Sequence, residues 1–436
     1  MNRFKIVLGS VLMLLLLVVL MTSSATRSNS TNDADSKTET FKAKKRAMVA
    51  EHERVFEKRK VELRKAVTAY FENALKSGDI IGVGVSIVNG DSILLSEGFG
   101  KRNINGRDKV DGKTIFRLGS LSKGFTGVLA ANLIEEDKLN WNDKVSDYLP
   151  QFRLGDRKNT DKVQLGHILS HTSGTPYHSF TNLVEAGLPM GKIAGRFNEV
   201  KPISEPGKMY SYQNAMFALS SEIMKKVTGK EIGALLKQRF FEPLGMHTAN
   251  TSYPTLVKYK NIATPHSRRR TGWQPKRLTD HYDNAVAAGG INASALDMAK
   301  WMRFLLGHNP EVMDKNVISE AFTPQVEINI GRKYYKRWPG HVSSHYAYGW
   351  RIHKFEDETA QNQITMWHHG GSVNNFRNEI AIYPDHDFGI CVLMNSNSRL
   401  ASTVIPDLQK IIENIYAEQS VQSAGSLAEA ASANLR

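Results

Sequence analysis

The strongest constraint on this chain comes from Ser120 and Lys123, which lie in the run Phe-Arg-Leu-Gly-Ser-Leu-Ser-Lys-Gly-Phe-Thr over residues 116–126. Apolar residues recur at helical spacing just after it, at Phe125, Val128, Leu129, Leu133 and Ile134. This spacing predicts a buried helix that begins close to Ser120. Because residues three apart share a helix face, we expect the Lys123 amine beside the Ser120 hydroxyl. Burial and the positive end of the helix dipole both lower the pKa of such a lysine, so the pattern indicates acyl transfer by a Ser–Lys pair.

A Ser-x-x-Lys pair has a simpler interpretation, in which the serine caps a helix and the lysine lies at its rim. In a chain of this length about one or two such pairs arise by chance. Here no other serine has a lysine three places on, and the single match opens a strongly apolar helix. Further motifs must decide between the two interpretations.

Those motifs are present and occur in order. Tyr212-Gln213-Asn214 follows a Pro-Gly turn and precedes an apolar helical stretch, and His369-Gly370-Gly371 precedes two strand-like runs, 380–383 and 388–395. Two connecting segments, 168–176 and 288–299, contain His-Thr-Ser-Gly and Ala-Gly-Gly. Across residues 62–416 the chain resembles the penicillin-recognising serine hydrolases related to class C β-lactamases, D-alanyl-D-alanine carboxypeptidases and family VIII-type esterases.

This resemblance implies an α+β fold, an α/β/α sandwich with a central antiparallel sheet flanked by helices and a mostly helical subdomain. It also implies roles for the motif residues. Ser120 would form the acyl-enzyme, Lys123 would hold the serine proton, and Tyr212 would relay that proton to the leaving group or activate water. A nearby cation must lower the pKa of a phenol for this task, and we expect Lys123 to supply it.

The resemblance also implies the substrate contacts. Asn214 would bind the substrate amide, and the backbone N–H groups of Ser120 and Ser372 would hold the oxyanion. The third motif, His369, Gly370 and Gly371, would line the substrate strand. His369 stands where β-lactamases carry a lysine, and Gly370 lacks the usual hydroxyl, which favours peptidase or esterase relatives.

Arg377 has two interpretations of equal weight. It can meet a substrate carboxylate in a bidentate contact, or it can be a surface residue.

Other matches to these patterns are expected to be structural. Tyr259-Lys260-Asn261 and Tyr282-Asp283-Asn284 also fit Tyr-x-Asn, but neither has the lead-in of Tyr212. The histidine pairs 167/171 and 341/345 have the four-residue spacing of helical metal ligands, but neither includes the Glu of a His-Glu-x-x-His site. We therefore predict no metal and no cofactor.

The N-terminal residues predict export. Arg3 and Lys5 precede an apolar stretch over residues 6–21, and small residues follow up to Ala25. This pattern is typical of a signal peptide cut after Ala25, with an uncleaved membrane anchor over residues 6–21 as the alternative. We expect a periplasmic or extracytoplasmic location and no nucleic-acid partner.

The rest of the chain is expected to form one catalytic domain with polar ends. Residues 26–61 indicate a polar linker, 26–40, followed by a basic helical segment, and residues 417–436 a disordered tail. The net charge of +14 allows association with anionic lipid or wall polymers, although a solvated helix face is the favoured explanation. Residues 83–95 predict a β-hairpin, and the single cysteine, Cys391, is expected to be buried in a strand.

The leading hypothesis is an exported serine hydrolase that acts on D-alanyl peptides or related amides of the cell wall, with a small-molecule or peptide substrate that includes peptidoglycan. One alternative is an esterase with the same Ser-Lys-Tyr machinery. Another is a wall-binding or penicillin-binding sensor that is acylated without turnover.

Overall fold

The computed structural model describes residues 31–329, 331, 333–356 and 363–416. The predicted signal or anchor segment and the predicted C-terminal tail lie outside these residues. The chain divides into two compact units: residues 1–66, 356–363 and 411–436 form one, and residues 67–355 and 364–410 form the other. None of the described helices is long and apolar enough to cross a membrane.

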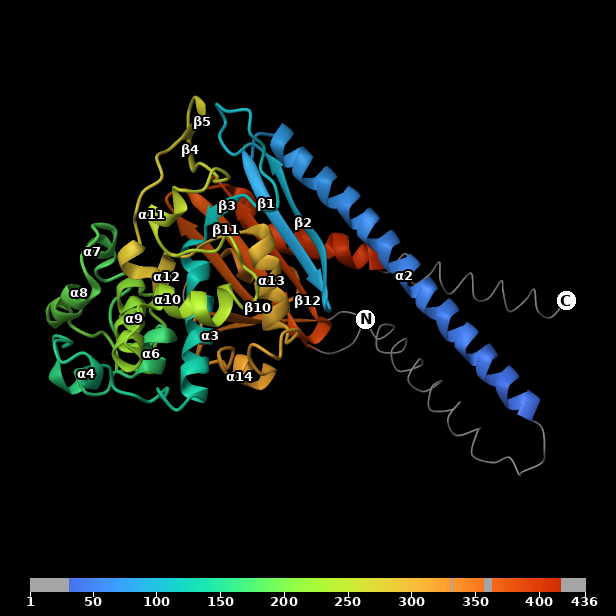
Figure 1. Ribbon diagram of the computed structural model, residues 1–436. Coiled ribbons are helices and arrows are strands. Elements are labelled where there is room, and N and C mark those ends of the chain that lie inside the picture. Colours follow the sequence, from blue (N-terminus) through green and yellow to red (C-terminus); the bar gives the residue numbers. More distant parts are fainter. Residues whose placement is uncertain (1–30, 330, 332, 357–362, 417–436) are drawn as a thin grey trace. The chain divides into compact units, whose positions relative to one another are not determined.

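The second unit is built on one eight-stranded sheet (Figure 1). Its order is β2-β1-β12-β11-β10-β9-β8-β7, so strands from both ends of the unit pair side by side. Neighbours run antiparallel in the pairs β1–β2, β1–β12, β11–β12, β10–β11, β8–β9 and β7–β8. The strands are β1 Gly82–Asn89, β2 Ser92–Gly100, β7 Val326–Glu327, β8 His341–Tyr346, β9 Arg351–Glu356, β10 Gln363–Val373, β11 Phe376–Tyr383 and β12 Phe388–Met394.

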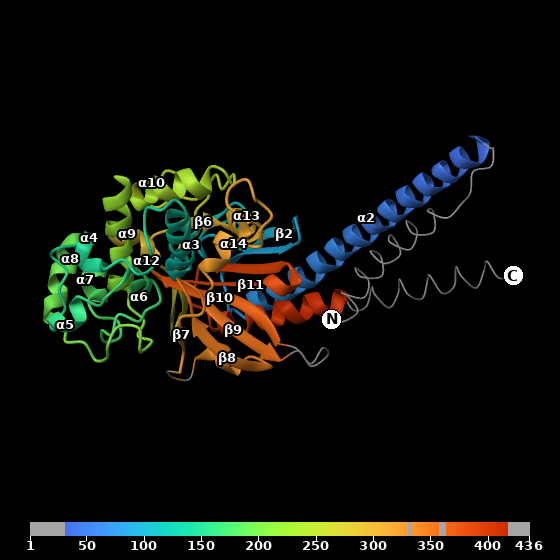
Figure 2. The same cartoon turned by 90° about the horizontal axis from the view of Figure 1, so that it is seen from below.

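Two further pairs of strands lie outside this sheet, β3 Ile115–Arg117 with β6 Asn292–Ser294 and β4 His266–Arg269 with β5 Gly272–Pro275. The helices are α2 Thr31–Lys76, α3 Ser122–Glu135, α4 Val145–Tyr148, α5 Arg157–Thr160, α6 Leu165–Leu169, α7 Thr181–Glu185, α8 Met190–Arg196, α9 Asn214–Thr228, α10 Ile232–Leu236, α11 Tyr253–Leu256, α12 Val286–Gly289, α13 Ala295–Leu305 and α14 Lys315–Glu320, with a last helix over 404–416. Helices α4 to α9 gather beyond α3, away from the sheet (Figures 1 and 2).

Helices cover both faces of the sheet. Gly84 of β1 lies against α13, where a Cβ at Gly84 would be 3.4 Å from that of Ala295. The neighbouring Val83 pairs with Phe99 of β2 and therefore faces the other side. There Phe71, near the end of α2, stacks on Phe99 at 5.4 Å between ring centroids. Burial of both faces explains why β1 is an almost unbroken apolar run, and the arrangement confirms the predicted α+β sandwich.

Most local predictions are confirmed. The hairpin consists of β1 and β2, a helix begins two residues after Ser120, and Cys391 is buried in β12. One prediction differs from the structure, because α2 begins at Thr31, within the segment that we expected to be a linker. Its Ser, Asn and Asp suggested a turn-rich stretch, but the Lys, Glu and Ala residues that follow favour helix and extend it towards the N-terminus.

Helix α3 lies unusually close to the segment that joins β8 and β9. A Cβ at Gly127 would lie 1.9 Å from the backbone oxygen of Tyr348, and one at Gly349 would lie 2.2 Å from the backbone oxygen of Lys123. Gly349 also has φ of +83°, which other residues adopt only with strain. Glycine at these two positions lets the backbone of α3 touch its neighbour directly.

Candidate active site

Ser120 lies in a single 3-10 turn, Gly119–Leu121, that leads directly into α3. Neither residue at the N-cap position of the turn or the helix, Leu118 or Leu121, makes a side-chain capping bond, and Ser120 is not a cap. Its half-buried hydroxyl oxygen lies 3.3 Å from Lys123 Nζ and 2.8 Å from Tyr212 Oη. The structure thus brings together three residues that the sequence places up to 92 positions apart.

The Lys123 side chain is fully buried. Its Nζ donates to Asn214 Oδ1 at 2.8 Å and to the backbone oxygen of Ala288 at 2.7 Å. Burial, with a smaller contribution from the charge of Arg351, lowers the pKa of Lys123 well below its usual value. A neutral amine has two hydrogens and one lone pair. The two oxygens take the hydrogens, so the lone pair is left for the Ser120 hydroxyl.

Tyr212 precedes α9 and donates its hydroxyl proton to Ser120 Oγ. Burial raises the pKa of Tyr212 to about 12, although Arg351 and the bond to Ser120 act in the opposite direction. The expectation that a nearby cation lowers this pKa is wrong, because burial outweighs the lowering influence of Arg351. The site therefore pairs an amine whose pKa burial lowers with a phenol whose pKa burial raises.

Asn214 opens α9, and its side chain is almost fully buried. Oδ1 accepts from Lys123, and Nδ2 donates to the hydroxyl of Tyr282 at 3.0 Å. Both ends of the amide are therefore bonded within the protein. Binding of a substrate amide by Asn214 stays a prediction.

The third motif lies on β10, a central strand of the sheet, as predicted. A Cβ at Gly371 would lie 2.2 Å from the backbone oxygen of Leu118, and one at Gly119 would lie 2.9 Å from the backbone of Ser372. Gly119 also has φ of +58°. These contacts bring the backbone of Ser372 beside Ser120, where the predicted oxyanion donors are needed.

His369 is fully buried and directs both ring nitrogens to protein groups. Nδ1 lies 2.8 Å from the backbone oxygen of Gly370, and Nε2 lies 3.0 Å from the Tyr346 hydroxyl. An Nδ1–H donor and an Nε2 acceptor satisfy both contacts, and burial, followed by the charge of Arg351, holds the pKa of His369 well below its usual value. The ring is neutral and orients Tyr346, while Gly370 and Gly371 present backbone.

Arg377 follows the motif on β11 and forms an ion pair with Glu379, with Nη2 2.8 Å from Oε1. Its guanidinium also lies over the ring of Tyr334 at 5.4 Å. The side chain is 22% exposed, so it is neither a free surface residue nor an unpaired cation. Contact with a substrate carboxylate would have to compete with Glu379.

Glu379 ends a chain of hydrogen bonds that runs over four strands, from β8 through β9 and β10 to β11. Ser344 Oγ lies 2.7 Å from His341 Nε2 and 2.8 Å from His353 Nδ1. His353 Nε2 lies 3.1 Å from His368 Nδ1, and His368 Nε2 lies 2.9 Å from Glu379 Oε2. Each neutral histidine donates with one nitrogen and accepts with the other, so all four bonds can point towards the carboxylate. Burial raises the pKa of Glu379 to about 7, against the lowering influence of Arg377 and Tyr334.

This shift predicts how the pH dependence of stability changes in Glu379→Gln. Between pH 4.5 and 7 the folded protein keeps a proton on Glu379 that the unfolded chain has released, so rising pH destabilises the wild type through this residue. Glutamine does not titrate. We expect the free energy of unfolding of the variant, relative to the wild type, to rise by on the order of 2 kcal/mol from pH 5 to pH 8.

Urea unfolding at a series of pH values measures this difference. The buried histidines are common to both proteins, and burial holds the pKa of His368, the one that bonds to Glu379, well below its usual value. Glu72→Gln, at an exposed position, is the control and should track the wild type at every pH. A constant difference between Glu379→Gln and wild type would contradict the raised pKa.

Arg351 is a residue that the sequence analysis missed. It begins β9, and its guanidinium lies 5.4 Å from the ring centroid of Tyr335 and 5.9 Å from that of Tyr346. Within the described residues, Nε and Nη1 are buried without a hydrogen-bond partner. The charge of Arg351 lowers the pKa of Lys123, Tyr212 and His369, so it lies within electrostatic reach of all three motifs. Only the order of the strands in the sheet brings Arg351 close to the three motifs.

No group of three or more His, Cys, Asp or Glu side chains that could hold a metal occurs within residues 42–329 and the later described stretches. His167 Nδ1 accepts the backbone N–H of Gln164, and His171 Nδ1 accepts that of Gln213. His171 lies 4.2 Å from the Tyr212 ring, between centroids, so it supports the segment that carries Tyr212.

Comparison with known proteins gives a match over most of the chain. The family model described as Beta-lactamase matches residues 67–409. Protein flp of Staphylococcus aureus (strain NCTC 8325 / PS 47) is 24% identical over 352 residues, which cover 80% of this chain and 66% of that protein. Unguisins hydrolase ungD of Aspergillus violaceofuscus (strain CBS 115571) is 25% identical over 357 residues, covering 74% and 59%. The chain thus spans about two thirds or less of the length of these curated relatives.

Two solved structures share the fold. The octameric penicillin-binding protein homologue from Pyrococcus abyssi superposes with a TM-score of 0.67 at 23% identity, covering 81% of this chain and 80% of that one. EstCE1, a hydrolase with promiscuous acyltransferase activity, gives 0.67 at 19% identity, covering 82% and 99%. These likenesses confirm the predicted fold, and the match to the family model confirms the resemblance on which the prediction depended.

Proposed function

The chain belongs to the beta-lactamase family of serine hydrolases, and from this premise we propose that it forms an acyl-enzyme at Ser120 and acts on D-alanyl peptides or related amides of the cell wall. The observation that carries the proposal is the position of Ser120 Oγ between Lys123 Nζ and Tyr212 Oη. Lys123 can take the proton from the Ser120 hydroxyl, and Tyr212 can donate a proton.

The reaction follows from these protonation states. Ser120 Oγ bonds to the substrate carbonyl carbon while its proton moves to the neutral Lys123 amine. The negative charge that develops on the carbonyl oxygen is met by the backbone N–H groups of Ser120 and Ser372. The bond to the leaving group then breaks, Tyr212 donates the proton that the leaving group needs, and the proton held by Lys123 replaces the one that Tyr212 has lost. Water repeats the sequence on the ester and releases the acid.

Arg351 supports a substrate that carries a carboxylate. A buried guanidinium with two unpartnered nitrogens is costly unless an anion completes it, and no carboxylate of the described residues forms an ion pair with it. The free C-terminus of a D-alanyl peptide is such an anion. An ester without a carboxylate would leave Arg351 unpaired.

A matched pair of substrates tests this proposal: a D-alanyl thioester with a free carboxylate and its methyl ester. For the wild type we expect kcat/KM to be about 100-fold higher for the carboxylate, and for Arg351→Met we expect most of this preference to disappear. Arg268→Met, at an exposed arginine, is the control. Equal rates for both substrates in the wild type would contradict carboxylate recognition.

The same pair of substrates distinguishes the D-alanyl peptide proposal from the esterase alternative. Gly370 provides no hydroxyl on the substrate strand, which favours an uncharged ester over a carboxylated substrate. Faster turnover of the methyl ester by wild type and Arg351→Met alike would establish the esterase. Acylation of Ser120 by a fluorescent penicillin without release would establish the sensor.

Export belongs to the same proposal. The basic start and the apolar stretch over residues 6–21 support it, and the exposed Lys42, Lys45 and Arg46 supply positive charge for association with anionic lipid. N-terminal sequencing of the chain recovered after cell fractionation tests it. An intact Met1 on a chain in the cytoplasmic fraction would contradict export.

A further inference from the structure

We infer that Tyr282 is a positioning residue for Lys123, acting through Asn214. This inference depends on the proposed acylation at Ser120. Tyr282-Asp283-Asn284 matched the Tyr-x-Asn pattern and was expected to be structural. The structure instead places the hydroxyl of Tyr282 one hydrogen bond from Asn214 and two from the Lys123 amine.

The orientation of the Asn214 amide matters to the lysine. With Nδ2 bonded to Tyr282, Oδ1 is held 2.8 Å from Lys123 Nζ and takes one of its hydrogens. If the amide turned over, its N–H would face Lys123 and occupy the lone pair that Ser120 requires. If the Asn214 amide rotated freely, the Lys123 hydrogen that now bonds to Oδ1 would lose its fixed acceptor. The bond to Tyr282 restrains the amide against free rotation, and while the hydroxyl accepts from Nδ2 it keeps Oδ1 towards Lys123.

Tyr282 is itself held rigidly. Its backbone has φ of +68°, in the left-handed region. Its ring packs on α12, where a Cβ at Gly289 would lie 2.8 Å from a ring carbon, and its backbone oxygen would lie 2.5 Å from a Cβ at Gly290. The following Ala288–Gly290 segment also supplies the second acceptor of Lys123. Tyr282 therefore contacts both structures whose oxygens accept from Lys123 Nζ: the Asn214 side chain and the α12 segment that contains Ala288.

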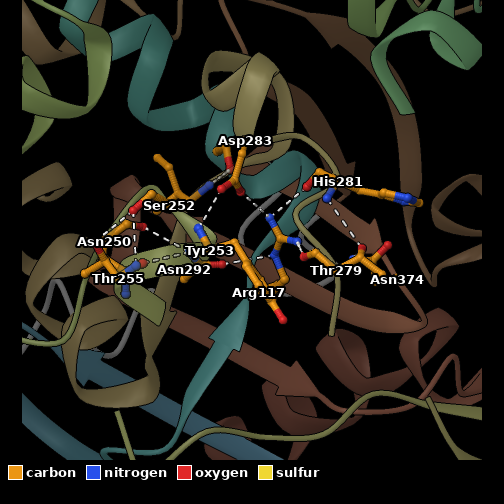
Figure 3. Close-up of polar contacts among 12 residues, drawn as sticks. Arg117, Asn250, Ser252, Tyr253, Thr255, Thr279, His281, Asp283, Asn292 and Asn374 are labelled. Carbon is orange, nitrogen blue, oxygen red and sulfur yellow. Dashed lines mark hydrogen bonds and ion pairs between the residues drawn. The ribbon is translucent and has the colours of Figure 1, made fainter. Parts of the chain in front are cut away.

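A buried arginine fastens the segment that carries Tyr282 to the strand that leads into Ser120 (Figure 3). Arg117 is 1% exposed and donates to the backbone oxygens of Thr279 and His281 and to Asp283 Oδ1 at 3.2 Å. Asp283 Oδ2 accepts the backbone N–H of Tyr253 at 2.6 Å. Because Arg117 lies three residues before Ser120, one side chain fixes the nucleophile strand and the residue next to Tyr282 together.

The third residue of the triplet completes this anchoring. Asn284 Nδ2 donates to the backbone oxygens of Val184 and Leu188, at 3.0 Å and 2.8 Å. All three side chains of the triplet thus hold the segment in place, and Tyr282 alone reaches the site.

Tyr282→Phe removes only the hydroxyl and is the test. With p-nitrophenyl acetate as the probe, we expect kcat to fall about ten-fold with little change in KM, because Tyr282 does not touch the substrate. Loss of a fixed acceptor destabilises the charged amine, so the acid limb of the pH profile should move to lower pH. Tyr259→Phe, in the other Tyr-x-Asn triplet, is the matched control and should behave as the wild type.

A double-mutant cycle shows whether Tyr282 acts through Asn214. In an Asn214→Ala background, Tyr282→Phe should have no further effect on kcat. Additive effects, or a Tyr282→Phe profile equal to that of Tyr259→Phe, would overturn the inference. Fluorophosphonate labelling separates this from failure of the proposed function: an unlabelled Ser120 in the wild type would refute the acyl-enzyme itself.

Discussion

Ser120→Ala is expected to abolish turnover, with kcat/KM reduced by at least about 10⁴-fold for any ester or amide that the wild type hydrolyses. Alanine leaves Lys123 and Tyr212 in place but removes the atom that bonds to the substrate. The fold should be unaffected, because Ser120 is half-buried and makes no capping bond. Intact-mass spectrometry after exposure to a fluorophosphonate or a fluorescent penicillin should show an adduct on the wild type alone.

Ser319→Ala is the control for this variant, since Ser319 is exposed and its hydroxyl donates to the Lys315 backbone oxygen. It should keep full activity and full labelling. An adduct on Ser120→Ala, or turnover within about ten-fold of the wild type, would place the nucleophile elsewhere.

Lys123→Arg is expected to reduce acylation by about 10³-fold. A guanidinium stays protonated, so it cannot take the serine proton, and the site was built around an amine whose pKa burial lowers. Lys123→Met, which fills similar space without charge, should lose activity equally and keep the fold more readily. Stopped-flow acylation with p-nitrophenyl acetate measures both.

The pH profile of the wild type complements these variants. Protonation of Lys123 removes the base, so the acylation rate should fall as pH drops through its lowered pKa, and this fall should lie well below the pH at which an ordinary lysine titrates. Lys138→Arg, at an exposed site, is the control and should retain the wild-type rate. A rate that still rises between pH 8 and pH 10 would indicate an unperturbed lysine and contradict the proposed base.

Local spacing in the sequence predicted the residues that act close together along the chain. Ser120 and Lys123 are three apart, with Ser120 in the 3-10 turn that leads into α3 and Lys123 in its first turn, and the apolar run after them is enough to predict that helix and its burial. Tyr212 and the third motif lie far away, and their position beside Ser120 came from the resemblance. Periodicity alone could not have brought them together, because it carries no information on how strands are ordered in a sheet.

The residues that were missed depend on such long-range order. Arg351 reaches the site because β9 lies two strands from β11, and Tyr282 because a left-handed turn directs its ring to α12. The pKa of Tyr212 was misjudged for a related reason, since its direction depends on burial, which no motif encodes. The Tyr-x-Asn pattern occurs both in the site, at Tyr212, and in a segment that supports the site, at Tyr282.

The close contact of α3 with the segment between β8 and β9 has a consequence for when the site is assembled. With backbone against backbone at Gly127 and Gly349, the helix has no room to slide or turn, so the separation of Ser120 and Lys123 is set once the chain has folded. The entropy lost in aligning nucleophile and base is then part of folding and need not be supplied again at each turnover. A larger side chain at either glycine should thus slow catalysis while the sheet and its core remain intact.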